Sequence, residues 1–178
     1  MYVRTKRVAS CLLKSLTIFH SRYYANRIQK RAGVTVLISD KTDVKAKTAQ
    51  GKDKEGHYIM IKWSIQQEDL AILNTYATNS DAPRFIKQLL LDIWKEIVSS
   101  TIIVEDFNTP LTALDRTLRQ KINKETLDLN CTLAQMDLKD PYKTYYPRTS
   151  EYTFFSSAHK TFSKRDYMIG HKTSLNKF

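Results

Sequence analysis

The chain has 178 residues, of which 42% are apolar, so it is long enough for one compact domain and its composition argues against wholesale disorder. Its formal net charge of +11 is spread along the whole chain, which favours a nucleic-acid partner over a role in solubility alone. The two cysteines, Cys11 and Cys131, fit no metal-ligand spacing, and no apolar run has the length needed to span a bilayer. We therefore expect two free thiols, no membrane partner and a nuclear or cytoplasmic location.

The N-terminal stretch is basic, because residues 1–39 contain several Lys and Arg but no Asp or Glu. An Arg-rich, acid-poor start is typical of a mitochondrial transit peptide, which leaves mitochondrial targeting as a minor alternative. We favour a basic segment without a targeting role, because its second half belongs to the resemblance described below.

The first predicted elements are strands. The β-branched run at 33–38 predicts one strand, and the polar, Lys-rich residues 41–56 predict a loop. Alternating apolar residues at 57–63 and the run at 70–76 predict two further strands, joined by a turn at 66–69.

A helix should follow, with Ser80 and Asp81 as N-cap candidates and Pro83 in its first turn. Its apolar face, which we expect to run as far as Ser99, consists of Phe85, Ile86, Leu89, Leu90, Ile93, Trp94 and Ile97.

Beyond it, the apolar run 101–104 predicts a buried strand, and residues 124–136 predict a second helix. Two late strands are expected at 152–155 and 166–169. The core candidates of the second helix are Leu127, Leu129, Leu133 and Met136. This order of elements favours an α/β fold with mixed sheets covered by helices.

Candidate chemistry follows the apolar strand directly, at Glu105, Asp106 and Asn108. Asp106 and Asn108 are two residues apart, so in extended chain both side chains lie on one face. A carboxylate can orient or deprotonate water, and an amide can donate to a phosphoryl oxygen, so the pair suits phosphodiester hydrolysis. The alternative is an Asx-type turn that closes a strand, and the spacing by itself favours that interpretation.

The wider context makes the pair more specific. Four segments occur in the order 73–79 (LNTYATN), 104–111 (VEDFNTPL), 152–156 (YTFFS) and 163–170 (SKRDYMIG). Together they resemble the endonuclease/exonuclease/phosphatase superfamily, which includes exonuclease III and the abasic-site endonucleases. Further segments resemble the endonuclease domain of LINE-type retrotransposon polyproteins, namely 30–34 (KRAGV), 39–43 (SDKTD), 53–60 (DKEGHYIM), 64–68 (SIQQE) and 82–88 (APRFIKQ).

The resemblance implies a two-sheet α/β sandwich of the deoxyribonuclease I type that nicks DNA with Mg²⁺ and takes no small-molecule substrate. Its implied catalytic residues are Tyr76 at the scissile phosphate, Asp106 as water activator and Asn108 at the phosphate, with Asp166 orienting a catalytic histidine. Its implied DNA-binding residues are Asn79, Arg116 and Thr153, the last on a DNA-contacting hairpin.

The resemblance covers residues 23–178, and residues 1–22 form a basic segment outside it. No counterpart precedes Tyr23 for the family strands that carry an active-site Asn and a metal-binding Glu. The final family strand, with its Ser-Asp-His motif, is also missing. We therefore expect an incomplete domain, truncated at both ends and catalytically impaired.

Within residues 23–178, single residues differ from the family pattern. Glu105 stands where the family has Gly, Thr78 where it has Pro, and Arg165 where it packs an apolar strand residue. The last change puts a charge where the family packs a side chain, and burial of that charge without a partner would be costly. Most of the tyrosines at 23, 24, 58, 145, 146 and 152 are expected in strands and the core rather than against nucleic acid.

Three functions remain in competition. The first is a LINE-derived, Mg²⁺-dependent endonuclease fragment with impaired activity. The second is a working repair nuclease related to exonuclease III or the abasic-site endonucleases. The third is a non-enzymatic, basic DNA-binding remnant or a pseudogene product.

Overall fold

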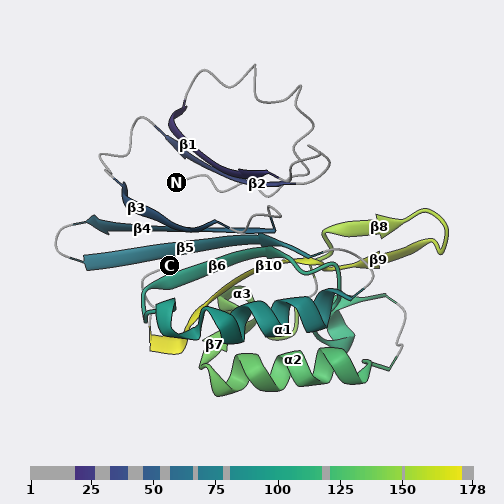
Figure 1. Ribbon diagram of the computed structural model, residues 1–178. Coiled ribbons are helices and arrows are strands. Elements are labelled where there is room, and N and C mark those ends of the chain that lie inside the picture. Colours follow the sequence, from purple (N-terminus) through teal and green to yellow (C-terminus); the bar gives the residue numbers. More distant parts are fainter. Residues whose placement is uncertain are drawn as a thin grey trace. The chain divides into compact units, whose positions relative to one another are not determined.

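The computed structural model describes residues 19–26, 33–39, 46–52, 57–65, 68–77, 81–117, 121–149 and 151–173. The chain forms two compact units. The first unit comprises Met1–Tyr76 and Ser100–Glu105, and the second comprises Ala77–Ser99 and Asp106–Phe178. Strands β1 to β5 precede the first described helix, and strands and helices are mixed in the rest of the chain, which confirms the expected α/β class (Figure 1).

The described residues of the first unit form strands and no helix. An antiparallel pair joins β1 (Phe19–Asn26) to β2 (Gly33–Ser39). Four further strands follow in the spatial order β3-β4-β5-β6, and β4 pairs antiparallel with both β3 and β5. Their bounds are Ala46–Lys52 for β3, Tyr58–Ile65 for β4, Glu68–Tyr76 for β5 and Thr101–Asp106 for β6.

The expected loop at 41–56 was wrong in part, because β3 lies inside it. Its sequence, AKTAQGK, contains a single β-branched residue and no aromatic one, so local propensity gives no signal for a strand. Pairing with β4 forms the strand instead. β3 ends the spatial order, and lysines are common in edge strands because they oppose further pairing.

The core of the first unit is aliphatic. Val36, Ile59, Ile61, Ile72 and Ile102 are buried together, and Leu70, Tyr76 and Val104 pack against them partly exposed. Full burial of one such side chain contributes roughly 1.5–3 kcal/mol, so these residues hold β2, β4, β5 and β6 together.

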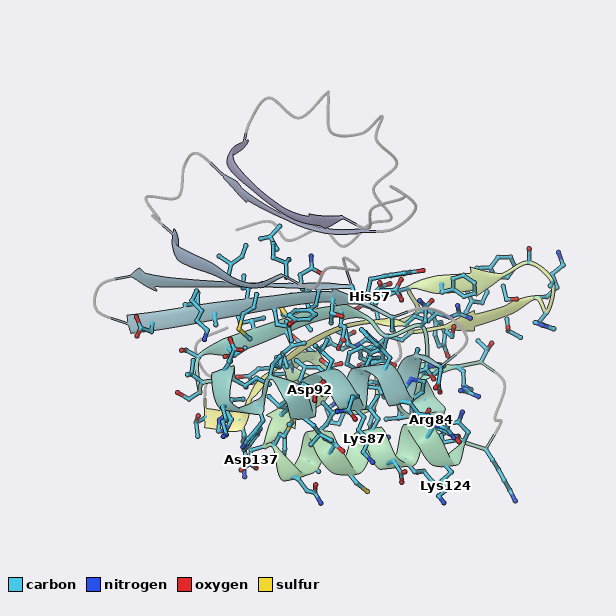
Figure 2. All side chains as sticks on the ribbon, viewed as in Figure 1. His57, Arg84, Lys87, Asp92, Lys124 and Asp137 are labelled. Atoms are coloured by element: carbon cyan, nitrogen blue, oxygen red, sulfur yellow. The ribbon has the colours of Figure 1, made fainter. Side chains whose placement is uncertain are left out.

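The second unit contains two main helices, α1 (Ala82–Asp92) and α2 (Lys124–Gln135). They lie side by side in Figure 1, and Arg84 of α1 is 3.1 Å from Glu125 of α2. Figure 2 labels Arg84 and Lys87 along α1, and Lys87 forms a longer ion pair of 3.8 Å with Asp128 of α2.

Helix α1 ends earlier than expected. Asp81 occupies the expected N-cap position, although its side chain makes no capping hydrogen bond. The helix stops at Asp92, and a 3-10 turn, η2 (Trp94–Glu96), replaces its expected last turns.

Helix α2 begins as its sequence predicts, with the side chain of Asn123 accepting the N–H of Thr126 at 2.9 Å. Leu129, Leu133 and Met136 are buried as expected, but Leu127 is 51% exposed. Buried positions 129, 133 and 136 follow the helical period, whereas position 127 is two residues from 129 and therefore points away.

Short elements complete the second unit. β10 (Asp166–His171) pairs antiparallel with β7 (Leu138–Lys139), and β8 (Phe154–Ser156) forms a hairpin with β9 (Thr161–Ser163). The remaining elements are η3 (Ala113–Asp115) and α3 (Pro141–Tyr145). No helix among the described residues is long and apolar enough to cross a membrane.

Candidate active site

Asp106 and Asn108 meet in a turn at the end of β6. The Oδ1 atom of Asp106 accepts the backbone N–H of Asn108 at 3.1 Å, which is the Asx-type turn that the sequence allowed. Asn108 has a φ of 49°, a left-handed conformation that asparagine tolerates well. The turn, rather than strand alternation, therefore brings this carboxylate and amide together.

Ala77 holds this turn through two hydrogen bonds. The side-chain Nδ2 of Asn108 donates to the carbonyl of Ala77, and the N–H of Ala77 donates to the carbonyl of Asp106 at 3.3 Å. Ala77 is buried, so the turn rests on a fixed support. The side chain of Asn108 also lines a cavity of about 340 Å³ together with residues of α1 and α2.

Thr153 holds the segment that carries Asp166. Its hydroxyl oxygen accepts the N–H of Arg165 at 3.0 Å and the N–H of Asp166 at 3.2 Å. The N–H of Phe107 donates to the carbonyl of Arg165 at 2.8 Å, which joins this segment to the turn at Asp106. The structure therefore brings Asp106, Thr153 and Asp166 together within the second unit.

Asp166 was expected to orient a histidine. It is exposed at the start of β10, and no hydrogen bond joins it to a histidine within the described ranges. The ring Nδ1 of His171 is 2.8 Å from the hydroxyl of Thr173, and His159 lines a cavity beside the β8–β9 hairpin.

Arg165, which stands where the family has an apolar residue, is half-buried and lies near the carboxylates of Asp106 and Asp166. Arg165 immediately precedes β10 rather than lying in it, and its guanidinium carbon is 3.6 Å from the ring centroid of Phe154. Burial lowers the pKa of Arg165, and the nearby carboxylate of Asp106 opposes that shift. The ring and the carboxylate offset part of the cost of removing the guanidinium from water.

Arg116 is positioned by its backbone. It follows η3, forms an isolated antiparallel bridge with Ser163, and is followed by Thr117, whose N–H donates to the carbonyl of Phe162 at 3.0 Å. Arg116 and Arg165 both line a cavity of about 390 Å³ beside the hairpin. Its other lining residues are Pro110, Ser156, His159, Thr161, Phe162 and Ser163.

Two predicted site residues remain, Tyr76 and Asn79. Tyr76 is the last residue of β5 in the first unit, where it packs partly buried against the aliphatic core. Asn79 lies outside the described residues.

The expectation that most tyrosines lie in strands and the core holds for part of the set. Tyr23, Tyr24 and Tyr58 are strand residues. Tyr145, Tyr146 and Tyr152 are instead exposed, because the short helix α3 and the edge of a two-stranded hairpin offer them no second layer to pack against.

Sequence reasoning missed the residues that line the hairpin cavity apart from Arg116. Ser156, Thr161 and Ser163 alternate with aromatic residues on β8 and β9, which is a strand signal. The segment at 161–163 is too short for that pattern to stand out in the sequence.

The resemblance implies a Mg²⁺ ion beside Asp106 and Asp166. Mg²⁺ prefers oxygen ligands in near-octahedral geometry and usually takes one or two carboxylates. No group of three or more His, Cys, Asp or Glu in the described part of the chain is placed to hold a metal ion. The positive charge of Arg165 also interacts with Asp106 and Asp166, which disfavours a cation beside them. The charge of Arg165 therefore makes Asp106 and Asp166 a poor ligand pair for the ion.

The fold is similar to that of solved endonucleases, exonucleases and phosphatases, as the sequence segments predicted. No protein-family model matches the chain.

Several solved nucleases share this fold. The endonuclease domain of TRAS1, a telomere-specific non-LTR retrotransposon, is similar with a TM-score of 0.67 and 10% identity over 88% of this chain and 68% of its own. A 3′ phosphatase from Neisseria bound to a product DNA hairpin has a TM-score of 0.66 and 15% identity, over 95% of this chain and 72% of its own. The AP endonuclease LMAP from Leishmania major has a TM-score of 0.65 and 15% identity, over 94% of this chain and 67% of its own.

Proposed function

We propose that this chain is a DNA-binding domain of LINE endonuclease origin whose Mg²⁺-dependent phosphodiesterase activity is impaired. The shared nuclease fold supports the class, and two similar structures, the Neisseria phosphatase and a D. rerio TDP2, were solved with DNA products. The net charge of +11 supports a polyanionic partner.

The observation that carries the impairment is the position of Arg165 beside Asp106 and Asp166. A neighbouring guanidinium repels the divalent cation that these two carboxylates would have to hold. Asp106 also accepts the N–H of Asn108, while the amide of Asn108 donates to Ala77. Both groups therefore already hold internal hydrogen bonds.

The test is the nicking of supercoiled plasmid by the full chain, in Mg²⁺ and in EDTA. We expect no EDTA-sensitive nicking above background, because loss of single members of such a constellation costs roughly 10²–10⁴-fold in rate. Asp106→Ala serves as the inactive reference. Nicking that requires Mg²⁺ and disappears in Asp106→Ala would overturn the proposed impairment.

A working repair nuclease is the second candidate. The pairing of a carboxylate and an amide in one rigid turn favours it, because that arrangement suits phosphodiester chemistry. Its discriminating variant is Arg165→Ile, which removes the guanidinium but keeps apolar contact with Phe154. If Arg165 alone suppresses a working site, this variant should gain nicking activity that the parent chain lacks.

A further inference from the structure

The β8–β9 hairpin has two chemically different faces. Its register pairs Phe155 with Phe162, and Ser156 with Thr161. Phe155 and Phe162 share one face, with their ring centroids 4.7 Å apart, and Tyr152 stacks on Phe162 at 6.1 Å. Because side chains alternate along a strand, Ser156, Thr161 and Ser163 fall on the other face. These three hydroxyl residues line the hairpin cavity.

The hairpin cavity has a strongly positive lining. Two guanidinium groups, Arg116 and Arg165, contribute to it, and none of the described residues that line it is acidic. Burial lowers the pKa of Arg165, the carboxylate of Asp106 opposes that shift, and repulsion from Arg116 adds to it. Arginine nevertheless stays charged in proteins, so the two groups repel each other within the cavity. An anion placed between them would relieve that repulsion.

Arg165 also has unused donor capacity. Its Nε atom is buried and has no hydrogen-bond partner among the described residues. Stacking on Phe154 fixes the plane of the guanidinium without using its N–H groups. A buried donor without an acceptor is costly, so Arg165 can lower its free energy by turning toward an oxygen acceptor in the cavity that it lines.

The shape of the donor set points to a phosphate group. Planar guanidinium groups bind phosphate oxygens through paired N–H groups, and hydroxyl side chains add neutral donors. The cavity volume of about 390 Å³ exceeds what one phosphate needs and leaves room for an attached sugar.

We propose that the hairpin cavity binds a backbone phosphate of DNA through Arg116 and Arg165, without a divalent cation. The identity of the occupant rests on the proposed DNA-binding function. Free inorganic phosphate offers the same anionic oxygen acceptors as a DNA phosphate. Arg165 thus has a positive role in binding while it disfavours a cation at Asp106 and Asp166.

The test measures the binding of a fluorescein-labelled duplex to the full chain by anisotropy, in EDTA and at several salt concentrations. Arg165→Ile should weaken binding about tenfold and reduce the log–log salt slope by about 0.9. Arg165→Lys should keep the slope and lose only part of the affinity, because the charge remains but the planar fork does not. Arg148→Ile is the matched control, since Arg148 is exposed, lies outside the cavity and should change affinity less than twofold.

The outcomes separate this inference from the proposed function. If the parent chain binds no duplex, the proposed function fails. If it binds and Arg165→Ile binds equally well, with an unchanged melting temperature, the DNA function stands and the cavity inference is wrong.

Titration with inorganic phosphate tests whether the cavity binds free phosphate instead of DNA. The inference is supported if phosphate displaces the duplex from the parent chain and displaces it less from Arg165→Ile. Phosphate binding is also measured by calorimetry. If Arg165→Ile abolishes phosphate binding but leaves the affinity for the duplex unchanged, DNA is not the occupant of the cavity.

Discussion

Tyr167 connects three segments of the second unit through one buried side chain. Its hydroxyl accepts the N–H of Leu111 at 2.9 Å and donates to the carbonyl of Lys164 at 3.2 Å, and its ring is 5.1 Å from that of Phe107. Lys164 and Leu111 flank the turn and the hairpin that carry the candidate site. Tyr167 therefore fixes the distance between the turn and the hairpin.

Tyr167→Phe should destabilise the chain by about 1–3 kcal/mol, because it leaves a buried N–H and a carbonyl without partners. Burial, and then the charge of Asp115, raise the pKa of Tyr167 far above its ordinary value. The folded state therefore holds this proton more tightly than the unfolded state does. The resulting stability is complete below about pH 10, the unfolded pKa, and is lost as pH rises beyond it.

Urea denaturation at pH 8 and pH 10.5 measures both effects. The parent chain should lose more stability over this interval than Tyr167→Phe, since the remaining tyrosines are common to both. Equal losses would show that the Tyr167 hydroxyl ionises freely in the folded state.

At the scale of elements, two buried ion pairs brace α3 against its neighbours. The Nζ atom of Lys164 is 2.7 Å from Oδ2 of Asp140, and Nζ of Lys143 is 2.9 Å from Oδ1 of Asp115. Asp140 also caps α3, because its side chain accepts the N–H of Tyr142 at 2.9 Å. Lys164 further lies 5.0 Å from the ring centroids of Tyr142 and Tyr167.

Asp140→Ala should cost about 3–5 kcal/mol, because it leaves the ammonium of Lys164 buried without its counter-charge. Asp128→Ala is the matched control, since Asp128 faces Lys87 at 3.8 Å on the surface and its loss should cost under about 1 kcal/mol. Chemical denaturation of both variants gives the comparison. Similar small losses in the two would mean that Lys164 finds water or another acceptor once Asp140 is gone.

The elements that sequence predicted well are those whose local pattern agrees with their packing. β2, β5 and α2 lie within two residues of their predicted positions, because apolar residues recur in them with the period of the structure they form. β1 and β9 carry mixed polar sequences and were not predicted. Strands of this kind form through pairing with a partner distant in sequence, which no local pattern records.

The candidate site was predictable to a similar degree. Asp106 and Asn108 stand out because an apolar strand ends in them, and the turn between them is visible in the sequence. The role of Arg165 depends on Phe154 and Arg116, which lie 11 and 49 positions away in the sequence. Sequence alone indicated a misplaced charge, and only the tertiary contacts show a stacked guanidinium.

For the whole molecule, the excess of basic residues should dominate its interaction with DNA. A net charge of +11 gives an attraction to phosphates that does not depend on base sequence. Each phosphate neutralised releases condensed counterions, so log Kd should rise linearly with log salt, with a slope of about 0.9 per contact. Arg116 and Arg165 alone would contribute a slope of about 1.8.

We therefore expect affinity for unrelated duplexes of equal length to be similar and to fall steeply between about 50 and 200 mM salt. Anisotropy titrations with two duplexes of different sequence, each at four or more salt concentrations, measure both properties. Heparin, a polyanion without bases, should displace either duplex. An affinity that hardly changes with salt, or that differs more than about tenfold between the duplexes, would mean that base contacts rather than the net charge govern binding.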